Sequence, residues 1–189
     1  MVAVSRIVAL AAAAALLVAC TRVSTDPGAT IVREVHDPLP ALQGEGLRGE
    51  SLSTDDLAGD VLVLNAWATW CQPCEQEQPD LVTVANSYAD RGVVFLGIDH
   101  QDGVAAAREW VRRFDVPYPS ISDRSGRIAA DLGYVGLPDT YVVDATGTIR
   151  YAINGATTTA QLSELLDRVL QSAPATASAS ASASASASP

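Results

Sequence analysis

The sequence predicts an α/β fold in three layers, in which a mixed central sheet is covered by helices on both faces. Three observations predict it. Short apolar runs rich in β-branched residues alternate along the chain with segments whose apolar residues recur at helical spacing. Two such runs near the carboxyl end flank the turn sequence Ala145-Thr146-Gly147, which indicates an antiparallel hairpin. An amphipathic segment follows this hairpin and predicts a closing helix.

The predicted strands are continuous apolar runs, as expected of strands that are buried on both faces. The first is Val61-Leu62-Val63-Leu64-Asn65-Ala66, and the helical segment that follows it ends at Gly92. In chain order the predicted strands are 61–66, 93–98, 141–144 and 148–153, the last being the antiparallel partner of 141–144.

The predicted helices carry apolar residues on one side only. The stripe in 79–88 consists of Leu81, Val84, Ala85 and Tyr88. The other predicted helices are 104–114, a short one over 127–132, and a last one in which Thr158 and Gln161 suit a capping box.

The length and charge of the chain limit the classes of function. With 189 residues, the chain suits one domain of ordinary size with extensions. Its formal net charge of −10 argues against a nucleic-acid partner, because binding to phosphates requires clustered basic residues.

Both ends of the chain lie outside the predicted domain. Residues 1–19 have the pattern of an export signal that is too short to cross a bilayer, and Cys20 after Ala19 is similar to a bacterial lipobox cysteine that receives a lipid. The alternatives are a plain secretory signal and an uncleaved anchor. Residues 20–38 are interpreted as a flexible tether, 39–172 as the folded domain, and the Ala/Ser-rich 173–189 as a disordered tail.

Cys71 and Cys74 carry the predicted chemistry. They follow a strand and open a helix, so their sulfur atoms lie close enough to bond. Cys71 at the helix start faces unpaired backbone N–H groups, which favour a thiolate, and Cys74 one turn further suits the resolving role. Attack by Cys71 on a disulfide and release by Cys74 constitute thiol–disulfide exchange.

Three alternatives fit less well. A structural zinc site needs about four ligands, and the only other Cys or His residues are Cys20, His36 and His100, the first two of which lie in the predicted tether. A purely structural disulfide with a two-residue spacer would restrict the unfolded chain little. A peroxidatic cysteine would have Thr three residues before Cys71, where this chain has Ala68. We therefore expect no metal and no cofactor beyond the disulfide.

These residues resemble a known group of proteins. The segment 65–74, with Glu77, Pro79 and the motif 136–144, is similar to the TlpA/ResA group of extracytoplasmic thioredoxin-like proteins over about residues 39–171. The resemblance implies a thioredoxin-like fold with an extra helix near 104–114. It also implies that Pro138 is cis and lies against the cysteines, and that Leu137 pairs its backbone with a substrate peptide.

The resemblance departs from classical thioredoxin at Asn65, where that protein has a buried Asp. Glu77 matches the acidic residue of the ResA-like group, which leads to the hypothesis that Glu77 is partly buried, has a raised pKa and modulates Cys74. The alternative is that Glu77 is a solvent-exposed residue in the first turn of the helix, without a role in the chemistry.

Four other side chains are weaker candidates. Trp70 is expected to shield the disulfide and contact substrate, whereas Trp67 suits either the core or the rim of the site. His100 could approach the cysteines or be a loop histidine without a role. Trp110 could belong to the core or to a partner surface.

The resulting expectation is a lipid-anchored, extracytoplasmic thiol–disulfide oxidoreductase. Its partners would be cysteine pairs of exported proteins and a membrane protein that supplies or accepts electrons. We expect a reductant, since members of the group reduce proteins such as apocytochrome c. The alternatives are an exported oxidase for folding proteins and a binding module without redox turnover; a Sco-like copper site would want Cys-x-x-x-Cys and a later His, which this chain lacks.

Overall fold

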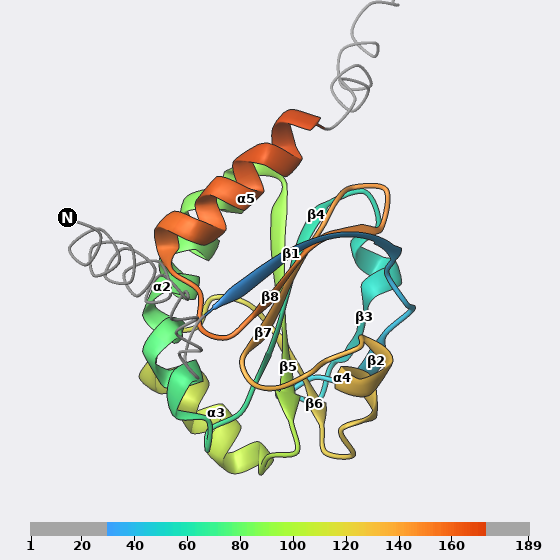
Figure 1. Ribbon diagram of the computed structural model, residues 1–189. Helices are drawn as coiled ribbons and strands as arrows, with labels where there is room; N and C mark the ends of the chain where they lie inside the picture. Colours follow the sequence, from blue (N-terminus) through green and yellow to red (C-terminus); the bar gives the residue numbers. More distant parts are fainter. Residues whose placement is uncertain (1–29, 173–189) are drawn as a thin grey trace, which may run out of the picture.

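The computed structural model describes residues 30–172, and a six-stranded sheet forms its centre (Figure 1). The strands of this sheet are β1 (Ile31–Pro38), β4 (Val61–Trp67), β5 (Val93–His100), β6 (Ser120–Asp123), β7 (Asp139–Val143) and β8 (Thr148–Asn154). The helices are α2 (Gln72–Tyr88), α3 (Val104–Arg113), α4 (Arg127–Asp131) and α5 (Thr159–Ser172), with short 3-10 turns at Thr54–Leu57 and Ala89–Arg91. The strands β2 (Gln43–Glu45) and β3 (Ser51–Ser53) pair in a separate small sheet.

The central sheet is mixed, as predicted. Its strand order is β1-β8-β7-β4-β5-β6, with β4, β5 and β6 parallel and β7, β8 and β1 antiparallel to their neighbours. The buried strands β4 and β7 lie side by side in the middle. This arrangement places the carboxyl end of β4, where the cysteine segment begins, beside the start of β7, where Pro138 lies.

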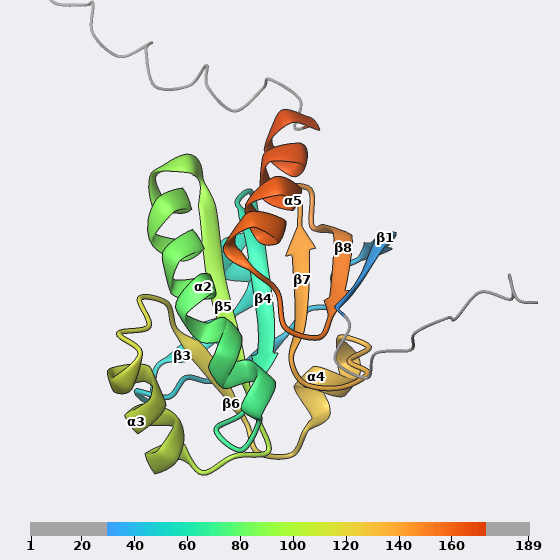
Figure 2. The same cartoon turned by 60° about the vertical axis from the view of Figure 1, so that its left-hand side comes forward.

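Each face of the sheet has its own hydrophobic core. On one face α2, α3 and α5 pack against β4 and β5, with α2 and α5 side by side (Figure 2). On the other face α4 and the segment around Leu42 cover the same strands. The three-layer prediction is therefore confirmed, and so is the helix near 104–114, which is α3.

The start of the domain was predicted wrongly. Residues 31–38, assigned to the tether, form the edge strand β1, which is antiparallel to β8. Most side chains of β1 are exposed on both faces, so the strand is held by its backbone ladder and has no apolar alternation to reveal it. The short strands β2, β3 and β6 were also missed. In β6 the sequence Ser-Ile-Ser-Asp carries one apolar residue, and its polar Ser120 and Asp123 are buried, so the strand has no apolar run to reveal it.

Three predictions fall outside the described residues: the export signal 1–19, lipidation of Cys20 and the tail 173–189. Within residues 30–172, no helix is both long and apolar enough to span a membrane.

Candidate functional site: a redox disulfide beside a cis-proline

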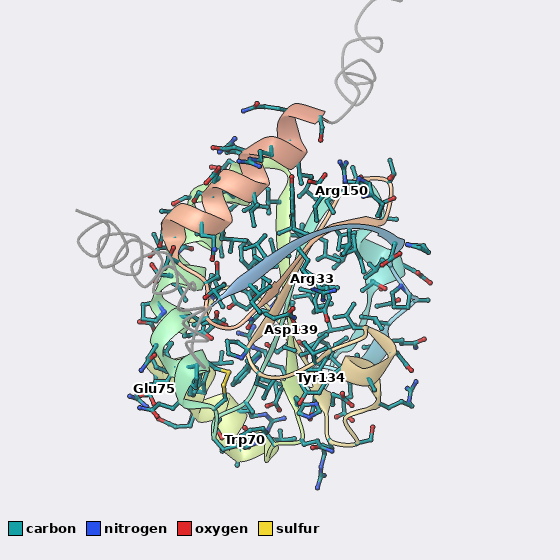
Figure 3. All side chains as sticks on the ribbon, in the orientation of Figure 1. Arg33, Trp70, Glu75, Tyr134, Asp139 and Arg150 are labelled. Carbon is teal, nitrogen blue, oxygen red and sulfur yellow. A yellow bond between two sulfur atoms is a disulfide. The ribbon has the colours of Figure 1, made fainter. Side chains whose placement is uncertain are left out.

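The two cysteines form a disulfide at the junction of β4 and α2. The Cys71–Cys74 bond has an S–S distance of 1.97 Å, and both residues are almost fully buried. Cys71 is the N-cap of α2, and its Sγ accepts a hydrogen bond from the backbone N–H of Cys74 at 3.2 Å. After reduction, this N–H and the helix dipole would stabilise a thiolate on Cys71. In Figure 3 the S–S bond lies at the start of α2, near Trp70.

The segment before β7 contains the cis peptide bond Leu137–Pro138. Pro138 is buried and Leu137 is half-buried between the two cores. The carbonyl oxygen of Pro138 accepts the N–H of Gly155 at 2.9 Å. A groove of about 370 Å³ runs between this segment and α2, and it is lined among others by Pro73, Gln76, Pro138 and Ala156.

Glu77 lies in the core beneath the site, with 1% of its surface exposed. Its Oε1 accepts a hydrogen bond from Asn65 Nδ2 and its Oε2 accepts one from the backbone N–H of Thr157, both at 2.9 Å. Burial raises the pKa of Glu77 to about 7; the two hydrogen bonds oppose this shift, and the negative charges of Asp80 and Asp139 add to it. Glu77 is three residues after Cys74, so both side chains lie on one face of α2. The carboxyl can therefore exchange a proton near neutral pH.

The three tryptophans separate into two environments. Trp70 is 60% exposed beside the disulfide, so it is available to a partner. Trp67 and Trp110 are buried and stack with their ring centroids 5.3 Å apart, which assigns both to the core.

Gln78 joins α3 to the helix of the site. Its Oε1 accepts the indole N–H of Trp110 at 3.0 Å, and its Nε2 donates to the hydroxyl of Tyr118 at 2.9 Å. Sequence reasoning missed this buried residue, although the apolar stripe of α2 points to it. Extending that stripe back by three and four residues from Leu81 reaches Gln78 and Glu77.

Strand β5 ends with a second buried carboxyl. Asp99 is fully buried, and neither of its carboxyl oxygens has a hydrogen-bond partner in the described part of the chain. Burial raises its pKa to about 7, and the charges of Asp102 and Asp123 add to the shift. The neighbouring His100 is also buried, with its ring on Tyr134 at 4.8 Å between centroids. His100 is thus a residue of strand β5 rather than of a loop.

The sequence pattern predicts no role for two further polar residues, the buried Asp139 and the half-buried Asn154. They lie next to Pro138 and on β8, respectively, and are bonded to each other. Within residues 30–172, no three His, Cys, Asp or Glu side chains are grouped as a metal site would require.

A buried disulfide at a helix start, open to partners through an exposed tryptophan and a cis-proline segment, is suited to exchange with other thiols. On this sheet it defines a thioredoxin-like thiol–disulfide oxidoreductase. The chain belongs to the AhpC/TSA family, whose model matches residues 35–152.

Proteins with similar sequences have names that fit this class. The thiol:disulfide interchange protein DsbE of Pseudomonas fluorescens is 39% identical over 127 residues, which cover 66% of this chain and 69% of that protein. The thiol-disulfide oxidoreductase ResA of Bacillus thuringiensis is 29% identical over 136 residues, covering 72% of this chain and 79% of that protein.

Solved structures with a similar fold also have names that fit this class. A DsbF homologue from Corynebacterium diphtheriae superimposes with a TM-score of 0.68 at 30% identity, covering 77% of this chain and 96% of that one. A secreted thiol-disulfide isomerase from Corynebacterium glutamicum gives a TM-score of 0.67 at 29% identity, with 78% and 93% covered.

Proposed function

We propose that this oxidoreductase is a disulfide reductase, held on the outer side of the cytoplasmic membrane by a lipid on Cys20, that acts on cysteine pairs of exported proteins. The observation that carries the direction is the position of Glu77, a buried acid one turn from Cys74. A strong oxidase is one whose reduced form is stabilised. A carboxylate near Cys74 opposes a second negative charge, so it disfavours the thiolate and makes the dithiol a better reductant.

The reaction follows from the arrangement of the two sulfurs. The Cys71 thiolate attacks a substrate disulfide, so that a bond between Cys71 Sγ and one substrate sulfur forms while the substrate S–S bond breaks. The released substrate sulfur takes up a proton. Cys74 then loses its proton, with Glu77 as the acceptor, and attacks Cys71 Sγ. This step forms the Cys71–Cys74 disulfide and breaks the bond between Cys71 Sγ and the substrate sulfur, which leaves as a thiolate and takes up a proton. The substrate is released as a dithiol that has gained the two electrons lost by the Cys71–Cys74 pair. A membrane thiol donor returns the pair to the reduced state.

Sequence features support the location. Residues 1–19 and Cys20 have the pattern of a lipoprotein signal, and the similar protein of C. glutamicum is described as secreted. The substrate class proposed from the resemblance includes the cysteine pairs of apocytochrome c. A Cys20→Ala variant that stays in the membrane fraction as the native protein does would contradict the lipid anchor.

The reduction potential of Cys71–Cys74 tests the direction. We expect a value nearer the about −270 mV of thioredoxin than the about −120 mV of strong oxidases, together with a mostly reduced pool in cells. A potential near −120 mV with an oxidised pool would instead support the oxidase alternative. Glu75→Gln, which removes an exposed carboxylate of the same helix, is the matched control for any shift seen with Glu77→Gln.

A further inference from the structure

The carboxylate of Asp139 organises the segment that carries the cis-proline. Asp139 directly follows Pro138 and is fully buried. Its Oδ2 accepts the backbone N–H of Val135 at 3.3 Å and the hydroxyl of Tyr141 at 2.8 Å. Its Oδ1 accepts the side-chain N–H of Asn154 at 2.6 Å. The two oxygens therefore bind different elements: Oδ2 bonds to Val135 in the segment before Pro138, and Oδ1 bonds to Asn154 on β8.

Asn154 is fixed from both sides. Its Nδ2 donates to Asp139, and its Oδ1 accepts the Nε–H of Arg33 on β1 at 3.2 Å. Figure 3 shows Arg33 and Asp139 in the same part of the molecule. If the amide of Asn154 turned over, its N–H groups would face the Arg33 donor, so the orientation is determined by both neighbours.

These residues border the groove beside the disulfide. Val135 and Asn154 line it, together with Pro138, Gly155 and Ile31. Val135 is 69% exposed and Ile31 is 57% exposed, so the groove offers apolar contacts to a polypeptide. The backbone of the Val135–Pro138 segment can bind such a polypeptide in one defined position only when the segment itself has a fixed conformation.

We propose that Asp139 and Asn154, braced by Arg33, are positioning residues for substrate binding. They fix the Val135–Pro138 segment so that the groove receives the residues next to the reacting cysteine of the substrate. Neither side chain takes part in the exchange of sulfur bonds. The inference rests on the thiol–disulfide exchange activity and assigns the placement of its polypeptide substrate to a hydrogen-bonded chain that reaches the edge strand.

A swap of the two side chains tests this assignment. In Asn154→Asp, studied at a pH at which both side chains are ionised, two carboxylates face each other, which opposes the native placement of the segment. In the double variant Asp139→Asn with Asn154→Asp, the new amide can keep its oxygen toward Val135 and donate to the new carboxylate, which still accepts from Arg33. Asn86→Asp is the control, since it makes the same change at an exposed position of α2.

The assay is reduction of a short fluorogenic peptide that carries one internal disulfide, with melting temperature and reduction potential measured alongside. We expect Asn154→Asp to raise KM at least about fivefold, with kcat within about twofold and the potential unchanged, because at least one hydrogen bond of the positioning chain is lost. The double variant should return KM to within about twofold of the native value. If Asn154→Asp does not fold, Asn154→Ala replaces it with the same fivefold expectation.

An unchanged KM in the single variant overturns the proposal. So does a double variant that melts like the native protein yet keeps the raised KM. Exchange of the native protein with dithiothreitol separates the two levels of inference, since this small thiol needs no groove. Failure of that reaction would refute the oxidoreductase activity itself, whereas equal peptide kinetics in all variants would refute only the positioning role.

Discussion

Replacing Glu77 by Gln is expected to remove a large part of the dependence of stability on pH. The pKa of Glu77 is about 7 in the folded protein and 4.5 as the ordinary value, mainly because of burial. Below the lower value both states are protonated, and above the higher one both are ionised. Between them the folded state holds a proton that the unfolded state has lost. The free energy of unfolding therefore falls by about 3 kcal/mol as pH rises through this window.

The Gln side chain removes this titration but does not preserve both hydrogen bonds. It can accept from Asn65 or from the N–H of Thr157, while its own amide hydrogens face the other donor. The lost bond costs about 1–3 kcal/mol at every pH. The variant is thus expected to be less stable than the native protein near pH 4.5, and to lose less stability as the pH rises to about 7.

Urea unfolding of the oxidised protein, followed by tryptophan fluorescence over a series of pH values, measures this difference. Glu75→Gln is the matched control, because Glu75 lies on the same helix but is exposed and paired with Arg113. The free energy of unfolding of Glu75→Gln should change with pH in the same way as that of the native protein. A constant difference between native and Glu77→Gln at all pH values would refute the raised pKa.

Three other measurements test the buried polar groups. Thiolate formation by the reduced pair should shift to lower pH in Glu77→Gln, since a nearby negative charge is removed, and an unchanged thiol titration would contradict the modulating role. Asp99→Asn should raise the free energy of unfolding above that of the native protein, because the native carboxylate is buried without partners. The difference should grow from about pH 4 to about pH 7 and reach about 3–4 kcal/mol. Equal stability of the two proteins at neutral pH would contradict this. Gln78→Ala should cost about 2–4 kcal/mol in urea unfolding, as Trp110 and Tyr118 lose their buried partner, whereas a loss below about 1 kcal/mol would show that the bonds contribute little.

The central strands and the helices that cover them could be predicted because burial dictates their composition. Strand β4 is buried at all seven positions, and its apolar run is visible in the sequence. The cysteine pair was equally visible, because its spacing and its place between a strand and a helix are local features. The cis peptide at Pro138 followed from the resemblance rather than from the spacing of residues.

The edge of the fold could not be predicted in this way. Strand β1 is held by backbone hydrogen bonds to β8, which leave no mark on side-chain polarity. Its Arg33 reaches the site only through Asn154, a partner 121 positions later in the chain. Contacts of this kind depend on the register of distant strands, which the local pattern does not determine.

The buried polar residues could be predicted only in part. Glu77 was a candidate because the resemblance pointed to it, and the structure shows its burial and its raised pKa. Asp139 stood in the same motif as Pro138 without a predicted role. An acid at the start of an otherwise apolar strand was a signal, but only the structure shows that it holds both Val135 and Asn154.

Trapping of a mixed disulfide tests the exchange mechanism most directly. In cells that express Cys74→Ser, the Cys71 thiolate should form a bond to substrate cysteines that no second sulfur can release. We expect complexes on non-reducing gels that disappear with dithiothreitol and that Cys71→Ser does not form. Complexes of equal abundance with both variants, or with neither, would contradict the assignment of Cys71 as the attacking sulfur and Cys74 as the resolving one.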